Sequence, residues 1–346
     1  MPSALCVFNP ESAICNPQSK QPATRNPELV THMSASPARP KIIVICGPTG
    51  IGKTAAAIEL ARVFGGEIVS ADSIQIYRYM DIGAAKPTPE ERAAICHHMI
   101  DIVEPSENFS AAQYGRLAAE CIADLSRRGR VPFVVGGTGL YIKALIHGLF
   151  QSPPIGPQIR RQLRQEVEAK GIEALYARLR RCDLESADRL HPNDTFRILR
   201  ALEVFESTGL SMSAYQKAHG FAEIRFDSLK IGLHIDRSAL YERINKRVDA
   251  MMDAGFLQEV VDLLRRGYSP ELKSMQSIGY RHLVDHLQGK CSLEETLETL
   301  KRDTRRYAKR QLTWFGADEE IIWKEPDQIE AIKKKVRSFI GSTGPN

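Results

Sequence analysis

The sequence predicts an α/β fold in which a parallel sheet carries a phosphate-binding loop (P-loop) and a helical insertion domain interrupts the sheet-forming segments. Short apolar runs rich in β-branched residues do not alternate with polar residues, which is typical of strands buried on both faces. Glycine-rich turns follow these runs and lead into helical patterns. Between residues 152 and 221 the strand patterns stop and only helical periodicity remains.

Length and composition agree with such a protein. The chain has 346 residues, of which 43% are hydrophobic, so it is long enough for two domains with a substantial core. The net charge is only +5, so a nucleic acid would have to bind local clusters of Lys and Arg. No stretch reaches the roughly 18 apolar residues of a membrane span. We expect a soluble, cytoplasmic monomer with no membrane contact.

The first forty residues differ from the rest. Residues 1–40 are rich in Pro, Ser, Ala and Asn and lack periodicity, so we expect a disordered N-terminal extension. Met33 lies eight residues before the first strand pattern and could be the natural start. A transit peptide is the alternative, but Glu11 and Glu28 argue against it.

The first apolar run, residues 42–46, predicts a buried strand and leads into a complete P-loop pattern. Gly50 and Gly52 let backbone N–H groups surround phosphate oxygens at the start of the next helix. Lys53 adds positive charge and the Thr54 hydroxyl can ligate Mg²⁺. An ordinary glycine-rich turn is the alternative, but strand, loop and helix patterns occur in the required order. The phosphate-binding residues are Gly47, Pro48, Thr49, Gly50, Ile51, Gly52, Lys53 and Thr54.

Two further strand patterns, residues 67–70 and 131–135, end beside polar residues. Carboxyl ends of parallel strands meet at one edge of a sheet, so Asp72 and Thr138 should lie near the P-loop. Asp72 could act as a general base, bind Mg²⁺ or cap a helix. Thr138 could be catalytic or could only satisfy a backbone group in a glycine-rich turn.

The cysteines and two adjacent histidines give no metal pattern. The seven cysteines are scattered without a Cys-x-x-Cys pair, which argues against a disulfide framework and a structural zinc site. The side chains of His97 and His98 should point in different directions, and no His, Cys or Asp set with ligand spacing accompanies them. We therefore interpret both histidines as structural.

Nine stretches, in order, resemble signatures of tRNA dimethylallyltransferases (tRNA isopentenyltransferases). Most are weak singly, but the shared order is specific, and the resemblance spans about residues 41–324. The end of the chain lacks the Cys/His finger of some eukaryotic relatives, so the sequence resembles the shorter bacterial form. The stretches are residues 47–54, 72–77, 80–87, 97–101, 135–141, 191–194, 197–203, 277–281 and 304–311.

The resemblance implies transfer of a dimethylallyl group from dimethylallyl diphosphate to the N6 amine of an adenosine next to the anticodon of tRNA, at position 37. An adenine amine is a poor nucleophile, so a base must take its proton, and Asp72 suits that role. The P-loop with Lys53, Mg²⁺ on Thr54, and Arg247 would stabilise the departing diphosphate. Arg247 rests on the resemblance, which pairs it with Thr49, because alone it would be read as a solvated helix charge. Thr138 completes the catalytic set.

The resemblance also assigns residues that face tRNA. From the residues themselves, Phe196, Leu199, Leu202 and Phe205 are expected on one helix face, with Arg197 and Arg200 on another. The alternative is a solvated amphipathic helix. A further basic stripe follows in Lys301, Arg302, Arg305, Arg306, Lys309 and Arg310. The implied tRNA-facing residues are Asp72, Ser73, Ile74, Gln75, Thr138, Arg160, Phe196, Arg197, Ile198, Leu199, Arg200, Gln276, Ser277, Ile278, Gly279, Tyr280 and Arg281.

We therefore expect five segments: the extension 1–40, a catalytic core in two parts, 41–151 and 222–324, the tRNA-facing insertion 152–221, and a tail 325–346. The second part of the core carries the basic C-terminal helices. The target base should flip into a channel whose far end receives the diphosphate. An adenylate isopentenyltransferase acting on free AMP, ADP or ATP is the nearest alternative, although an Arg-rich insertion favours a large acceptor. A small-molecule kinase or nucleotide-regulated protein with ATP in the P-loop is the more distant one.

Overall fold

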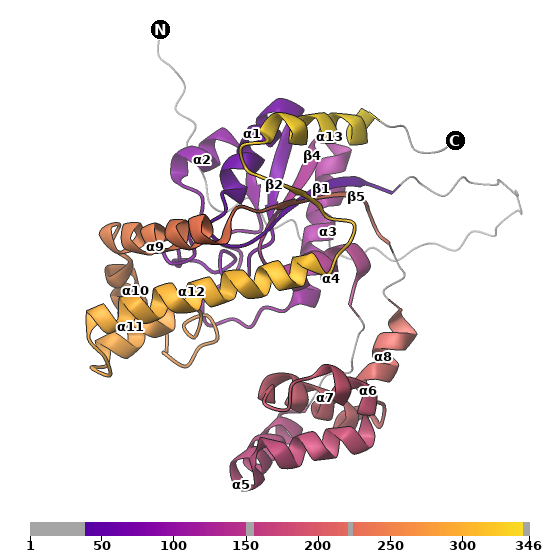
Figure 1. Cartoon of the computed structure of the whole chain (residues 1–346), viewed down its shortest axis with the longest axis vertical. Coiled ribbons are helices and arrows are strands. Elements are labelled where there is room, and N and C mark those ends of the chain that lie inside the picture. The colour runs from indigo at the N-terminus through magenta and orange to yellow at the C-terminus, as the bar shows by residue number, and fades with distance from the viewer. Residues whose placement is uncertain (1–38, 150–155, 221–223, 342–346) are drawn as a thin grey trace, which may run out of the picture. The chain divides into compact units, whose positions relative to one another are not determined.

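Six parallel strands form one sheet in the order β3-β2-β4-β1-β5-β6. The strands β1, β2, β4 and β5 are labelled in Figure 1. The expected α/β fold with a parallel sheet is confirmed. The computed structural model describes residues 39–149, 156–220 and 224–341, so the extension expected at residues 1–40 lies, except for its last two residues, outside the described part. The strands are β1 (Lys41–Cys46), β2 (Gly66–Ser70), β3 (His97–His98), β4 (Val131–Gly136), β5 (Asp227–Leu233) and β6 (Ile322–Lys324).

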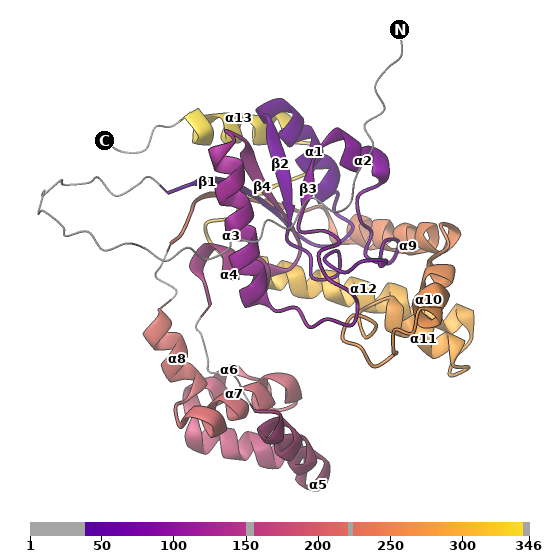
Figure 2. The same ribbon diagram turned by 180° about the vertical axis from the view of Figure 1, so that it is seen from behind.

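The central strand β1 is apolar from Ile42 to Cys46 because helices cover both faces of the sheet. Ile42 and Val44 point into a core with helices α3 (Ala111–Arg127) and α4 (Gly139–His147). Ile43 and Ile45 point into the opposite core with helix α1 (Lys53–Phe64). In the view from behind, α3 lies in front of the sheet (Figure 2). The pleat sends successive residues to opposite faces, so a strand between two cores shows no polar alternation.

The strand order brings three loops together at the carboxyl edge. β4 lies between β1 and β2, so the chain segments that follow these three strands are neighbours. Ala71, just after β2, donates its N–H to Val135 O at 2.7 Å and accepts from Thr138 N at 3.1 Å. The P-loop, residues 71–75 and residues 137–138 therefore share one corner of the molecule.

Four helices of the second half complete this edge: α9 (Arg237–Asp253), α10 (Phe256–Arg265), α11 (Tyr280–Leu287) and α12 (Leu293–Gly316). α12 begins with a capping box formed by Ser292 and Glu295. Its inward residues, among them Leu300, Ala308 and Phe315, are buried. The helix is therefore held along its length against the core.

Residues 329–341, which lie in the segment 325–346 expected as a C-terminal tail, form a helix. α13 (Ile329–Gly341) packs Ile332 and Val336, both fully buried, against the same core as α1. Their spacing of four residues is typical of one face of a helix. Residues 342–346 lie outside the described part.

The helical segment between the two halves of the sheet consists of α5 (Pro157–Cys182), α6 (Leu184–Arg189), α7 (Thr195–Thr208) and α8 (Met212–His219). The short helix α2 (Pro89–Ala94) is not part of it and lies between β2 and β3. The segment has a core of its own, which includes Leu175, Ile198 and Leu202. The Asp183 carboxylate accepts from Ser186 N at 3.0 Å and from Ser213 N at 3.1 Å, so one side chain caps α6 and contacts the start of α8.

The expectation that Phe196 lies on the apolar face of α7 is wrong. Phe196 is 81% exposed, whereas Ile198, Ala201 and Leu202 are buried. A spacing of three residues falls short of a full turn by about 60°, so a side chain nine residues before Phe205 points about 180° away from it.

Within the described residues, no helix is both long and apolar enough to cross a membrane.

Candidate active site

The P-loop backbone adopts conformations that favour glycine. Gly47, Gly50 and Gly52 have φ values of 140°, 80° and 100°. A Cβ atom at Gly47 would also lie 2.7 Å from the Leu233 carbonyl oxygen, so a larger residue would clash with β5. These conformations expose backbone N–H groups at the start of α1, where an anion is favoured.

A cavity of about 500 Å³ opens in front of this loop, and cations line two of its sides. Lys53 belongs to the P-loop side, where its Nζ donates to the carbonyl oxygens of Gly47 at 3.0 Å and Pro48 at 2.7 Å. α9 contributes Arg243 and Arg247 from the other side. Thr54 also lines this cavity. The cavity therefore combines a phosphate-binding loop with several positive charges.

The positive charge in this cavity is poorly compensated. Burial and, next, the charge of Arg247 lower the pKa of Lys53 to about 8, although Asp72 opposes the effect. Burial also lowers the pKa of Arg247, against the attraction of Asp72. Among the described residues no side chain forms an ion pair with Arg247, and Glu242 of the same helix pairs with Lys246 at 2.6 Å. Arg247 is thus a partly buried cation at a cavity wall and not a solvated helix charge.

Asp72 stands at the end of β2 with its two carboxylate oxygens in different situations. Oδ1 accepts hydrogen bonds from the backbone N–H groups of Ile74 at 2.9 Å and Gln75 at 3.3 Å, so it caps the turn after the strand. Within the described residues Oδ2 has no hydrogen-bond donor. Asp72 therefore caps a turn and not a helix, which was the alternative expected from the sequence, and one carboxylate oxygen stays available in the cavity.

A second cavity, of about 230 Å³, meets the first at Asp72. The two cavities share Thr49, Asp72, Arg247 and Tyr307 among their lining residues. The remaining wall of the second cavity is mainly apolar, with Ile244, Val248, Met251, Phe256, Ile278 and Leu300. A polar and an apolar cavity thus adjoin at one carboxylate and one guanidinium.

Thr138 and Gln311 hold the loops around these cavities. Thr138 Oγ1 accepts from Ser73 N at 3.1 Å, which is the structural role considered for it from the sequence. Gln311 of α12 is 5% exposed; its Oε1 accepts from Thr49 N at 2.8 Å and its Nε2 donates to Gly137 O at 2.9 Å. The sequence analysis gave Gln311 no role, although its spacing from the apolar Leu300 and Phe315 places it on the inward helix face.

Glu259 of α10, which had no expected role from the sequence, holds the loop at residues 81–83. Its carboxylate accepts from the backbone N–H groups of Asp81 at 2.8 Å, Ile82 at 2.7 Å and Gly83 at 3.1 Å. It also accepts from the hydroxyl of Tyr280 at 2.7 Å. The loop held in this way continues into Ala84, which lines both cavities.

Comparison with known proteins identifies the family. The IPP transferase family model matches residues 75–318. The chain is 57% identical over 298 residues to a tRNA dimethylallyltransferase of Desulfosudis oleivorans, covering 86% of this chain and 94% of the relative. It is 52% identical over 304 residues to tRNA dimethylallyltransferase 1 of Pelobacter propionicus, covering 88% and 98%. The chain belongs to the tRNA dimethylallyltransferase family.

Solved structures of the family have the same fold. A tRNA isopentenylpyrophosphate transferase of Bacillus halodurans is 39% identical, with a TM-score of 0.66 over 87% of this chain and 97% of that one. A eukaryotic dimethylallyltransferase acting on tRNA is 30% identical, with a TM-score of 0.74 over 88% and 80%. The resemblance to tRNA dimethylallyltransferases is confirmed.

The segment 276–281, which the family resemblance assigns to tRNA, lies against the active-site cavities. Ser277, Ile278 and Gly279 line the apolar cavity together with Asp72, Ser73 and Ile74. Gln276 donates to Pro270 O at 2.8 Å, and the Arg281 guanidinium donates to Asp303 at 2.7 Å. The Tyr280 side chain is fully buried, and its hydroxyl donates to Glu259, so it anchors the segment to the core.

The remaining tRNA-facing residues expected from the family belong to α5 and α7. Ile198 is fully buried and can act only through packing, whereas Arg197 is exposed and pairs with Asp194 at 3.5 Å. Arg160 and Arg200 share Glu203, at 3.6 and 3.3 Å. These surface pairs are weak in water.

The basic stripe on α12 is less free than its sequence indicates. Lys301 pairs with Asp249 at 2.5 Å, and Arg305 donates to Asn245 at 2.7 Å. Arg302 and Arg306 lie 3.6 and 3.5 Å from Asp303. The stripe therefore serves in part to attach α12 to α9.

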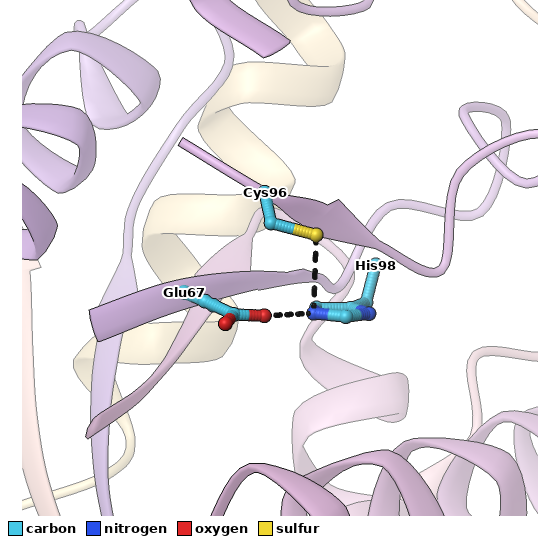
Figure 3. Close-up of side chains that lie close together, drawn as sticks. All are labelled: Glu67, Cys96 and His98. Atoms are coloured by element: carbon cyan, nitrogen blue, oxygen red, sulfur yellow. Dashed lines mark hydrogen bonds and ion pairs between the residues drawn. The ribbon is translucent and has the colours of Figure 1, made fainter. Parts of the chain in front are cut away.

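His98, interpreted from the sequence as structural, lies close to two other side chains that could ligate a metal ion. Its Nε2 lies 2.7 Å from Glu67 Oε2 and 3.5 Å from Cys96 Sγ (Figure 3). Glu67 belongs to a neighbouring strand, so no spacing along the sequence reveals the cluster. His97 instead contacts the carbonyl of Ile95 through Nδ1.

Proposed function

We propose that this chain transfers a dimethylallyl group from dimethylallyl diphosphate to the N6 amine of adenosine 37 in the anticodon loop of tRNA, with release of diphosphate. The observation that carries the proposal is the junction of a cationic, P-loop-lined cavity with an apolar cavity at Asp72 and Arg247. The names of the curated relatives support both tRNA as acceptor and the dimethylallyl group as cargo.

The larger cavity suits the diphosphate of the donor. Backbone N–H groups at the start of α1, the Lys53 ammonium and the Arg247 guanidinium can neutralise a leaving group whose charge grows as the carbon–oxygen bond breaks. Mg²⁺ fits the same place, because the Thr54 hydroxyl is a hard oxygen ligand beside the phosphate position. When bound, the ion would neutralise diphosphate oxygens.

Asp72 accounts for the acceptor chemistry. The backbone hydrogen bonds to Oδ1 fix the orientation of the carboxylate, so that Oδ2 can take a proton from the adenine amine. The nitrogen forms a bond to the primary carbon of the dimethylallyl group, that carbon loses its bond to the diphosphate oxygen, and the amine proton passes to Asp72. Atoms and charge balance without a further reactant.

The acceptor must reach Asp72 from a loop, because an adenine in a stacked helix presents no free amine to a protein cavity. Segment 276–281 and the loop residues 72–75 border the apolar cavity and can receive a flipped base there. The arginines of α5 and α7 can contact the tRNA backbone. All these groups belong to one chain, which favours a monomer, and a tRNA substrate favours the cytoplasm.

One assay separates this activity from the two alternatives. Labelled dimethylallyl diphosphate is offered with undermodified tRNA, with AMP, or without acceptor, and ATP hydrolysis is measured in parallel. We expect label in tRNA alone and negligible ATP turnover. Label in AMP would instead identify an adenylate isopentenyltransferase. ATP hydrolysis that disappears in Lys53→Ala would identify a nucleotide-hydrolysing enzyme.

A further inference from the structure

A cluster of three possible metal-binding atoms lies outside the proposed active site, beside strands β2 and β3 (Figure 3). Glu67 is the second residue of β2, Cys96 precedes β3, and His98 ends it. Parallel pairing sets Ile68 beside His97 and Val69 beside His98. Alternation along both strands then puts the side chains of Glu67 and His98 on the same face of the sheet.

The atoms are close enough to share one ion. Glu67 Oε2, Cys96 Sγ and His98 Nε2 all lie within 4.8 Å of one another. A zinc ion binds sulfur at about 2.3 Å and nitrogen or oxygen at about 2.0 to 2.2 Å in a tetrahedral arrangement. Such an ion would need only a modest opening of the 2.7 Å contact between His98 and Glu67, to about 3.3 Å.

We propose that Glu67, Cys96 and His98 form a binding site for a divalent transition-metal ion, best matched by Zn²⁺, with the fourth position open to water. Thiolate, imidazole and carboxylate are the three donor types that zinc sites use. Mg²⁺ and Ca²⁺ are disfavoured because they select oxygen donors. The site is distinct from the P-loop, which would hold Mg²⁺ on oxygen ligands.

The three possible ligands differ in solvent exposure and in whether they already carry a negative charge. Cys96 is exposed and the His98 side chain is 26% exposed, so an ion can enter from solvent. Burial raises the pKa of Glu67, but hydrogen bonds from Arg128 and His98 outweigh it and hold the pKa at about 2, so this ligand is already charged. Burial and the charge of Glu67 raise the pKa of the Cys96 thiol. Metal binding must therefore displace the thiol proton.

Two arginines limit the affinity. Arg128 donates to both oxygens of Glu67, at 2.8 and 3.2 Å, and Arg130 lies 3.6 Å from Oε1. Asp124 partly neutralises Arg128 at 2.8 Å. The remaining positive charge opposes a cation, while the hydrogen bonds orient the carboxylate. We therefore expect an exchangeable ion, bound more weakly than in a closed four-ligand structural site.

Occupation would link an edge strand to the sheet. β3 has only two residues, and the chain after it leads to Asp101, whose N–H donates to Gln75 O at 3.1 Å. A shared ion would hold β3 to β2 on one side of this connection. Because an ion that binds only the folded chain stabilises it, Zn²⁺ should raise the unfolding temperature.

The test uses full-length, chelator-treated protein and Co²⁺ as a spectroscopic substitute for Zn²⁺. We expect one Co²⁺ per chain, with thiolate-to-cobalt charge-transfer absorption and the intense visible bands of tetrahedral coordination, both removed by excess Zn²⁺. Cys96→Ser should abolish the charge-transfer absorption, and His98→Gln should weaken binding by about tenfold or more. Cys291→Ser, which changes a thiol bonded to Thr296, is the matched control and should leave the spectrum unchanged.

A featureless cobalt spectrum would overturn the proposal, and so would a charge-transfer band that persists in Cys96→Ser. Thermal unfolding with and without Zn²⁺ gives a second readout. The stabilisation should be present in the native chain and in Cys291→Ser, and absent in Cys96→Ser and His98→Gln. Equal stabilisation of all four proteins would assign the effect to other sites. Neither measurement depends on prenyl transfer, so the outcome is independent of the proposed function.

Discussion

The side-chain Oε1 atom of Gln311 accepts a hydrogen bond from the backbone N–H of Thr49 across 2.8 Å. The same amide donates through Nε2 to Gly137 O, so one residue of α12 joins the P-loop to the loop after β4. The Gln311 side chain is buried, and its hydrogen bond to Thr49 spans 262 positions of the sequence. It fixes the position of Thr49, which lines both cavities.

Gln311→Leu should therefore impair both stability and donor binding. Leucine keeps the volume but leaves the partly buried N–H of Thr49 and the buried C=O of Gly137 without these partners, which costs about 2 kcal/mol of unfolding free energy. Urea unfolding measures this loss, and steady-state kinetics should show a raised KM for dimethylallyl diphosphate. Gln258→Leu, which removes an exposed side-chain bond to Asp262, is the control and should change neither quantity. An unchanged donor KM in Gln311→Leu would mean that the P-loop keeps its shape without this contact.

Asp72→Asn should leave binding nearly intact and lower kcat by about 10² or more, the range for a positioned base. The asparagine Oδ1 can still accept the hydrogen bonds from Ile74 and Gln75, so the turn keeps its shape. Single-turnover kinetics with saturating donor and tRNA measure the effect. If donor affinity and the Mg²⁺ requirement collapse while the chemical step survives, Asp72 is a metal ligand instead.

The pKa of Lys53 predicts a pH dependence of donor binding. Burial and Arg247 lower this pKa from 10.5 to about 8, so the ammonium of the free enzyme loses its proton as the pH rises through 8. Affinity for inorganic diphosphate should then fall above pH 8, with proton uptake on binding. Lys53→Arg keeps its charge and should lack this fall. Calorimetry between pH 7 and about 9.5 in buffers of different ionisation enthalpy measures both effects; an identical profile in the two proteins would contradict the assignment.

The same shift has a defined sign for stability. The folded chain binds fewer protons than the unfolded chain between the folded pKa of about 8 and the unfolded value of 10.5. The contribution of Lys53 to the free energy of unfolding is therefore unfavourable below pH 8 and becomes less so as the pH rises through this window. Lys53→Met should accordingly be more stable than the native chain at pH 7, and this difference should shrink towards pH 10.

Local patterns predicted the parts of the molecule in which neighbours in sequence are neighbours in space. β1, the P-loop and α1 follow one another within residues 41–64, so their residue types suffice to predict them. The partners of Gln311, Glu259 and Glu67 could not be predicted in this way, because they lie far along the chain. Phe196 was expected on the apolar face of α7 but is exposed, because side chains spaced three residues apart shift steadily around a helix of 3.6 residues per turn.

Glu259→Gln should loosen the loop that borders both cavities. The native carboxylate accepts three backbone N–H groups and the Tyr280 hydroxyl, and hydrogen bonds to a charged group are worth roughly 1.5 to 3 kcal/mol each. A glutamine has a single acceptor oxygen, so we expect a loss of about 2 kcal/mol in unfolding free energy and a lower kcat. Glu298→Gln on the exposed side of α12 is the control. A fall in stability without any change in kcat would limit Glu259 to a structural role.

The insertion arginines provide the last prediction. Replacing Arg160, Arg197 and Arg200 by Ala removes the cations that we expect to contact tRNA phosphates, without touching the P-loop, Asp72 or Arg247. The tRNA KM should rise, the donor KM should stay constant, and the slope of log affinity against log salt should shrink by roughly 0.7 to 0.9 per lost contact.

Glu203 allows a test with the opposite sign. It lies 3.6 Å from Arg160 and 3.3 Å from Arg200, so it competes with phosphate for both cations. Glu203→Gln should therefore tighten tRNA binding, by a modest factor because exposed ion pairs are worth about 0.2 to 1 kcal/mol. Filter binding over a salt series measures both variants. If the triple variant binds tRNA with unchanged affinity and salt slope, the arginines are ordinary surface charges, and recognition shifts to the basic stripe of α12, where Lys309 and Arg310 would be the next residues to replace.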